Sequence, residues 1–160
     1  MEYKACSFTG HRKIDFEHKN KISDLVARAV NYAYEKGCRN FYTGGALGFD
    51  TIAAREIINF RIKHPDVRLI LVLPCMNQAE MWSQAEKSAY EYTISVADEI
   101  EYISEKYYDG CMKERNVRLA ELCDILIAYV GRMVGGSAQT ARIAKKLGKE
   151  VYNLYPTLSK

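Results

Sequence analysis

Two glycine pairs stand where a polypeptide backbone could bind an anion. Gly44-Gly45 follows the strand-like run Asn40–Thr43, and Gly135-Gly136 lies a few residues after the apolar run Asp124–Tyr129. Glycine lets a backbone approach a ligand closely, and the N-terminus of a following helix presents unpaired N–H groups with partial positive charge. Two such strand–glycine–helix corners predict an anion-binding cleft and favour the phosphate of a nucleotide as the anion.

A third turn, Thr9-Gly10-His11-Arg12, follows the first apolar run and offers a hydroxyl, a flexible glycine and two basic side chains. Arg12 could hold a phosphate through two parallel hydrogen bonds. A solvent-facing turn that leads into the first helix is an equal alternative. For His11 alone, a structural or surface role is favoured.

Asp50 lies near the start of the helix after Gly44-Gly45 and is the candidate catalytic residue. The helix dipole alone also favours an acid there. At ~4 Å a carboxylate and a phosphate repel each other by ~4 kcal/mol at an effective dielectric constant of about 20. Asp50 is therefore expected to bind ribose hydroxyls or to act at a sugar carbon, unless an arginine stands between the two charges.

Three more residues complete the candidate binding site. Ser137 is expected to cap the N-terminus of a helix that begins near Ala138, a geometry that also points backbone amides at an anion. Arg115 and Asn116 lie on the preceding helix. Arg115 could add positive charge to the cleft, and an arginine on the surface is the alternative.

Gln78 and Trp82 are four residues apart and are expected to share one helix face. Trp82 could stack on a base, although a lone tryptophan packs in a core more often. The twelve tyrosines are dispersed and form no regular stripe.

The elements that must position these residues alternate along the chain. We expect strands at 4–8, 40–43, 68–73, 99–103, 124–129 and 150–154, and helices at 19–35, 49–63, 79–96, 113–122 and 138–147, with Pro74 closing the third strand. This alternation implies right-handed crossovers. The predicted class is α/β: a Rossmann-like three-layer sandwich with a mainly parallel sheet and helices on both faces, as one domain over residues 1–160. Ligands bind at the carboxyl ends of such strands, where the three turns converge.

Composition narrows the class of function. The chain has 160 residues, 48% of them hydrophobic and 27% charged, as expected for a soluble globular protein. Its net charge of +3 does not favour a nucleic-acid partner. No apolar run approaches the ~20 residues that span a bilayer, and no signal-peptide pattern is visible, so we expect a cytoplasmic protein without a membrane partner. Five scattered cysteines predict buried, reduced thiols, and three scattered histidines predict no metal site.

These residues together resemble the SLOG superfamily, and specifically its YpsA-like branch. The resemblance implies a nucleotide or ADP-ribose-like ligand held by the glycine turns, and a homo-oligomer. We expect no cofactor. The matching pieces extend over nearly the whole chain in the family's order: Phe8-Thr-Gly-His-Arg12, Thr43-Gly-Gly-Ala-Leu-Gly-Phe-Asp50, Leu73-Pro74 with Gln78 and Trp82, Tyr90, Arg115-Asn116, Asp124-Ile-Leu-Ile-Ala128 and Gly135-Gly136-Ser137.

One position departs from the phosphoribohydrolases of that superfamily. Glu114-Arg115 resembles the Glu-Arg of their Met-His-Glu-Arg-Lys motif, but Arg142 stands where their second motif carries a catalytic glutamate. An arginine can neither act as a base nor stabilise an oxocarbenium-like centre. The leading hypothesis is therefore a sensor-type nucleotide-binding protein. An N-glycosidic-bond hydrolase or transferase that uses Asp50 and a DprA-like DNA-binding module are the two alternatives.

Overall fold

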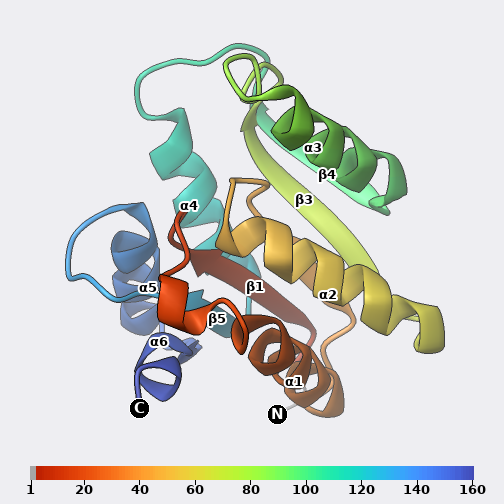
Figure 1. Ribbon diagram of the computed structural model, residues 1–160, viewed down its shortest axis with the longest axis vertical. Coiled ribbons are helices and arrows are strands. Elements are labelled where there is room, and N and C mark those ends of the chain that lie inside the picture. The colour runs from red at the N-terminus through yellow and green to blue at the C-terminus, as the bar shows by residue number, and fades with distance from the viewer. Residues whose placement is uncertain (1–2) are drawn as a thin grey trace.

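Strands and helices alternate along the chain in the computed structural model, which describes residues 3–160 (Figure 1). The strands are β1 (Ala5–Gly10), β2 (Asn40–Thr43), β3 (Arg68–Cys75), β4 (Glu99–Ser104), β5 (Ile125–Tyr129) and β6 (Glu150–Asn153). The helices are α1 (Ile22–Glu35), α2 (Phe49–Lys63), α3 (Gln84–Val96), α4 (Cys111–Leu122) and α5 (Gly136–Lys146), with a short 3-10 helix η1 (Phe16–His18) and a short helix α6 (Tyr155–Leu158).

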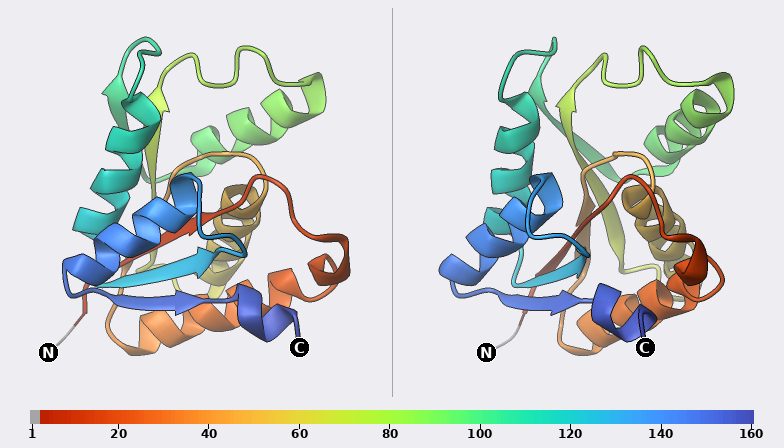
Figure 2. Two further views of the ribbon diagram at one scale, coloured as in Figure 1. Left: turned by 90° about the vertical axis from the view of Figure 1, so that its left-hand side faces the viewer. Right: turned by 60° about the vertical axis from the view of Figure 1, so that its left-hand side comes forward.

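The six strands form one parallel sheet in the order β4-β3-β2-β1-β5-β6. Helices α4 and α5 cover one face, and α1, α2 and α3 lie on the other, as Figure 2 shows. The predicted Rossmann-like α/β sandwich is confirmed. From β1 the chain adds β2, β3 and β4 in turn toward one edge of the sheet. It then returns and places β5 on the other side of β1. The carboxyl ends of β1 and β5 therefore form the topological switch point, where ligands bind in such sheets.

The core explains why these segments form these elements. β3 and β5 are buried along nearly their whole length, as their continuous apolar runs require of strands covered on both faces. In α1 the buried residues, among them Ile22, Val26 and Val30, recur at helical spacing and face the sheet. Burying each such side chain stabilises the fold by about 1.5–3 kcal/mol.

Several expected boundaries are wrong, among them the end of β1 at Gly10 and the start of α1 at Ile22, and three others bear on the site. β3 continues through Pro74 to Cys75, because its pairing with β2 ends at Leu71 and only β4 flanks the strand beyond that point. A proline is tolerated there, as on an edge strand. The helix expected at 79–96 begins only at Gln84, since Ser83 and Glu86 form a capping box.

The third wrong boundary concerns Ser137. Helix α5 begins at Gly136, with Gly135 as its N-cap at φ +105° and no side-chain cap. Ser137 therefore lies inside the first turn of α5 and is not the capping residue. Likewise, Gln78 and Trp82 precede α3 and share no helix face.

Candidate functional site

The turns after β1, β2 and β5 are tied together by backbone contacts. Phe49 donates its N–H to the carbonyl oxygen of His11 at 3.1 Å, and His11 donates its own N–H to the carbonyl oxygen of Tyr129 at 3.2 Å. Gly48, at φ +79°, lies so close to the first turn that a Cβ there would stand 2.1 Å from the carbonyl oxygen of Arg12. Only glycine fits this position, so the turn sequences themselves bring the carboxyl ends of the strands into one site.

A cavity of about 380 Å³, here called the polar hollow, lies between the first turn, α4 and the N-terminus of α5. It brings together ten of the twelve residues predicted as the site: Thr9, Gly10, His11, Arg12, Asp50, Arg115, Asn116, Gly135, Gly136 and Ser137. Lys13 and Arg132 also line it and were not predicted. Their neighbours in the turns, Arg12 and Gly131, were the only sequence signal that could have found them.

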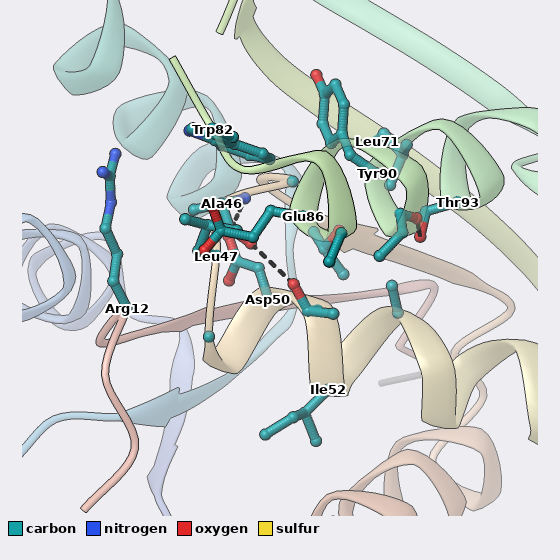
Figure 3. Close-up of a pocket in the computed structure, with 17 residues that line it drawn as sticks. Arg12, Ala46, Leu47, Asp50, Ile52, Leu71, Trp82, Glu86, Tyr90 and Thr93 are labelled. Atoms are coloured by element: carbon teal, nitrogen blue, oxygen red, sulfur yellow. Dashed lines mark hydrogen bonds between the residues drawn. The ribbon is translucent and has the colours of Figure 1, made fainter. Parts of the chain in front are cut away.

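A second cavity of about 510 Å³, the apolar hollow, lies between α2 and α3 (Figure 3). Ala54 of α2 and Ala85 and Ala89 of α3 line it, and Trp82 and Tyr90 meet edge to face there, with ring centroids 5.0 Å apart. Both cavities are of a size typical of ligand pockets. They share Arg12, Ala46 and Asp50, so the two hollows adjoin at Asp50.

Asp50 is almost completely buried, with 5% of its surface exposed. Its Oδ2 accepts a hydrogen bond from the N–H of Ala46 at 3.1 Å, whereas its Oδ1 is buried without a partner among the described residues. Burial raises the pKa of Asp50 to about 6, and the positive charges of Arg115 and Arg12 oppose that rise. At neutral pH the carboxylate is therefore ionised and faces both hollows.

Arg115 of α4 is also buried, with 6% of its surface exposed. Its Nη1 donates to the carbonyl oxygen of Gly44 at 2.5 Å, and its Nε donates to Oδ1 of Asn116 at 2.9 Å. Asn116 in turn lies against Gly136, where a Cβ would stand 3.0 Å from Nδ2. The two glycine corners are thus connected through one pair of side chains.

The glycines after β2 do not enter the polar hollow. Gly44 lies behind it, with its carbonyl taken by Arg115, and Gly45 lines the apolar hollow instead. Burial lowers the pKa of Arg115, and the charge of Asp50 offsets part of this effect. The inner wall of the site therefore carries a buried arginine and a buried carboxylate as a compensating pair of charges.

Three of the four buried side-chain atoms without a hydrogen-bond partner in the described chain surround the Gly44-Gly45 turn. They are Oδ1 of Asp50, Oγ1 of Thr43 and Oε1 of Gln78. The amide nitrogen of Gln78 is already used, because it donates to the carbonyl oxygen of Gly45 and to the hydroxyl of Tyr90. Buried polar atoms are normally paired, and two of these three belong to Thr43 and Asp50, which line the apolar hollow and can offer hydrogen bonds to a molecule placed there.

The rim of the polar hollow is basic. Arg12 is exposed, and its side chain extends away from the packed residues of the apolar hollow (Figure 3). The side chain of His11 links the first turn to the turn after β5, because its Nε2 accepts a hydrogen bond from the N–H of Gly131 at 2.8 Å. Burial and the nearby charge of Arg132 lower the pKa of His11, which favours the neutral ring that this acceptor role needs.

We also searched residues 3–160 for a metal site, a membrane-spanning helix and paired cysteines. That part of the chain contains no group of three or more His, Cys, Asp or Glu residues placed to hold a metal ion. It also contains no helix long and apolar enough to cross a membrane. All five cysteines are buried and unpaired. Arg142, at the position of the phosphoribohydrolases' glutamate, donates from Nη1 to the carbonyl oxygen of Met133 at 2.7 Å.

Fold and site together define a Rossmann-like protein with a basic, ligand-sized crevice at the switch point of its sheet. The chain belongs to the YspA SLOG family (YpsA), whose family model matches residues 6–152. A UPF0398 protein of Bacillus thuringiensis (strain Al Hakam) is 28% identical over 163 residues, covering 95% of this chain and 89% of that relative.

Two solved structures share the fold. DNA processing protein A from Helicobacter pylori, described for its single-stranded DNA binding, matches 92% of this chain at 23% identity with a TM-score of 0.64. DNA processing protein A (DprA) from Streptococcus pneumoniae matches 94% at 18% identity with a TM-score of 0.67. This chain spans only 63% and 50% of those two chains, respectively.

Proposed function

We propose that this protein binds a phosphorylated ribonucleoside or an ADP-ribose-like nucleotide at the two adjoining hollows, as a sensor-type member of its family. The observation that supports this most is the position of Asp50. Its unpaired Oδ1 lies at the junction of a basic cavity and an aromatic one. A ribose joins a phosphate to a base in the same order, and its hydroxyls are suitable donors to a carboxylate.

Each part of a nucleotide meets a matching surface in this arrangement. The phosphate lies in the polar hollow, where Arg12 and the free backbone N–H groups at the N-terminus of α5 favour an anion. The ribose donates to Asp50. The base enters the apolar hollow beside Trp82, where it can stack on the indole ring without specific hydrogen bonds to its edges.

Isothermal titration calorimetry against AMP, NAD, ADP-ribose and cyclic ADP-ribose isomers tests the proposal. We expect at least one of these to bind with a stoichiometry of about one per chain, and Asp50→Asn to weaken it by about tenfold or more, because a hydrogen bond to a charged group is lost. Asp109→Asn is the matched control, since Asp109 is exposed in the turn before α4. A folded sample that binds none of the panel contradicts the proposal.

A second candidate is hydrolysis of an N-glycosidic bond, and the buried Asp50 carboxylate with its unpaired Oδ1 favours it. The bond between the anomeric carbon and the base would break with its electron pair leaving on the base, water would bond to that carbon, and the proton that water loses would end on the base. Asp50 would stabilise the positive charge that develops on the sugar. Base release from nucleoside monophosphates, followed by chromatography, should then stop in Asp50→Asn; unchanged turnover in that variant removes Asp50 from the reaction.

The fold it shares with DprA makes binding of single-stranded DNA the third candidate. The net charge of +3 does not favour it, because non-specific binding to DNA depends on many phosphate contacts. Fluorescence anisotropy with a labelled oligonucleotide decides the matter. We expect no binding at physiological salt; a measurable affinity that falls steeply with added salt would revive this candidate.

A further inference from the structure

The polar hollow continues outward into a third cavity of about 230 Å³, here called the outer hollow. It has six lining residues: His11, Lys13, Asp15, Gly131, Arg132 and Tyr155. Of these, His11, Lys13 and Arg132 also line the polar hollow. The apolar, polar and outer hollows therefore form one continuous series, and a ligand seated at Asp50 can extend in either direction.

The walls of the outer hollow are fixed by contacts already made within the protein. Nε2 of His11 accepts from Gly131, so in the neutral ring Nδ1 carries the proton and is a donor with no partner in the described chain. The imidazole packs edge-on against Tyr129 and Tyr155, with ring centroids 5.7 Å and 6.4 Å away. This donor is thus held in place before any ligand arrives.

The charges around the outer hollow favour an anion. Lys13 and Arg132 are exposed and positive, and neither forms an ion pair with a residue of the described chain. Asp15 is the one acidic residue in the lining, and its Oδ2 already accepts a hydrogen bond from the hydroxyl of Tyr155. Two cations, one hydrogen-bonded carboxylate and a neutral imidazole leave a net positive charge at this end of the series.

We propose that the outer hollow is a second anion subsite, which binds the second phosphate of a nucleoside diphosphate whose first phosphate lies in the polar hollow. This inference rests on the proposed function and makes it more specific. It names the ligand class as a diphosphate, free or esterified, rather than a nucleoside monophosphate. Arg132 and Lys13 contact the second phosphate, and Nδ1–H of His11 supplies a neutral hydrogen bond.

Calorimetric titration with AMP and ADP tests the inference, because the two ligands differ only by the second phosphate. We expect the wild-type protein to bind ADP about tenfold more tightly than AMP, because one added charge-assisted contact contributes about that factor in affinity. Arg132→Gln and Lys13→Gln should each weaken ADP about three- to tenfold, and AMP by a clearly smaller factor, because both side chains also border the polar hollow. Lys106→Gln, an exposed lysine after β4, is the matched control and should change neither affinity.

The outcomes separate this inference from the proposed function. Equal affinities for AMP and ADP, or variants that weaken both ligands alike, overturn the second subsite and leave nucleotide binding intact. A 5′-phosphorylated dinucleotide that gains more than ADP overturns it in favour of a nucleic-acid backbone. If neither AMP nor ADP binds to the folded protein, both proposals fail together.

Discussion

Arg115 of helix α4 donates a hydrogen bond to the carbonyl oxygen of Gly44, in the turn after β2, at 2.5 Å. Gly44 begins the turn that leads from β2 into α2, and Arg115 lies on α4 across the sheet. The contact passes around the carboxyl edge of the sheet, where the hollows lie. The site is thus assembled from both helical layers, and its geometry depends on a side chain that is 71 positions away in sequence.

Replacing this arginine should destabilise the protein. Arg115→Gln leaves the Gly44 carbonyl without its charged donor and Asp50 without its nearest compensating charge, so we expect the free energy of unfolding to fall by about 2–4 kcal/mol. Arg118→Gln on the same helix removes an exposed pair with Glu101 and should cost about 0–1 kcal/mol. Urea denaturation of both variants measures the difference, and equal losses would show that Arg115 does not hold the turn.

The stability of the protein should depend on the ionisation of Asp50. The folded state keeps this proton up to a pH of about 6, whereas the group's ordinary pKa is 3.8, so ionisation opposes folding. The free energy of unfolding should therefore fall as the pH rises from about 4 to 6 and stay lower above that range. Asp50→Asn should be more stable than the wild type by about 1–3 kcal/mol at pH 7.5, with the difference vanishing near pH 4.

Thermal unfolding over this pH range, with Asp109→Asn alongside, measures the effect. A gain in stability that does not change with pH would mean that the Asp50 carboxyl is not the group responsible. The same variant is expected to lose nucleotide binding, so a more stable protein with a weaker site would show that Asp50 is retained for function at a cost in stability.

Two glycines with positive φ should respond differently to alanine. At Gly48 a Cβ would collide with the backbone of Arg12, whereas at Gly135 it would meet no atom within 4 Å. Gly135→Ala should cost only the strain of its backbone conformation, about 1–3 kcal/mol, and Gly48→Ala clearly more, because a collision with backbone is added. Denaturation midpoints decide this, and a Gly48 variant as stable as the Gly135 variant would contradict the close approach of the first two turns.

Trp82 should matter for binding more than for stability. It is half-buried and lies outside the main core. Trp82→Ala should weaken a purine nucleotide by about 5- to 100-fold, the usual contribution of stacking on a base, while the melting temperature changes little. Tyr92→Ala, an exposed aromatic on α3, is the control for calorimetry. An unchanged affinity in Trp82→Ala would place the base elsewhere.

Much of the fold could be predicted from the sequence because its strands are apolar and its helices are bounded by clear signals. The bounds of β2 and α2 agree with the prediction. Gly37 follows the C-terminus of α1 and has φ 114°, as is usual for a glycine that terminates a helix. The start of α3 was missed because apolar and helix-forming residues continue upstream of Ser83. The capping box of Ser83 and Glu86 starts the helix at Gln84, although the residues before Ser83 also favour a helix.

The polar hollow could be predicted because parallel strands bring their following turns to one edge. Its burial and partners could not, since the contact of Arg115 with Gly44 joins segments that no local pattern relates. For the apolar hollow the sequence offered only single residues, such as Trp82, and no pattern that predicts a cavity. Its existence depends on the distance between α2 and α3, which is set by side chains from several elements at once.

Helix α3 buries none of its side chains completely, although it forms the outer wall of the apolar hollow. Amide hydrogens in such an element exchange with solvent through low-energy local openings, whereas those of the core strands need far larger ones. We therefore expect α3 to open locally more readily than the core strands. If a nucleotide binds as proposed, we expect little selectivity among bases and expect the anionic end of the ligand to decide which molecules bind.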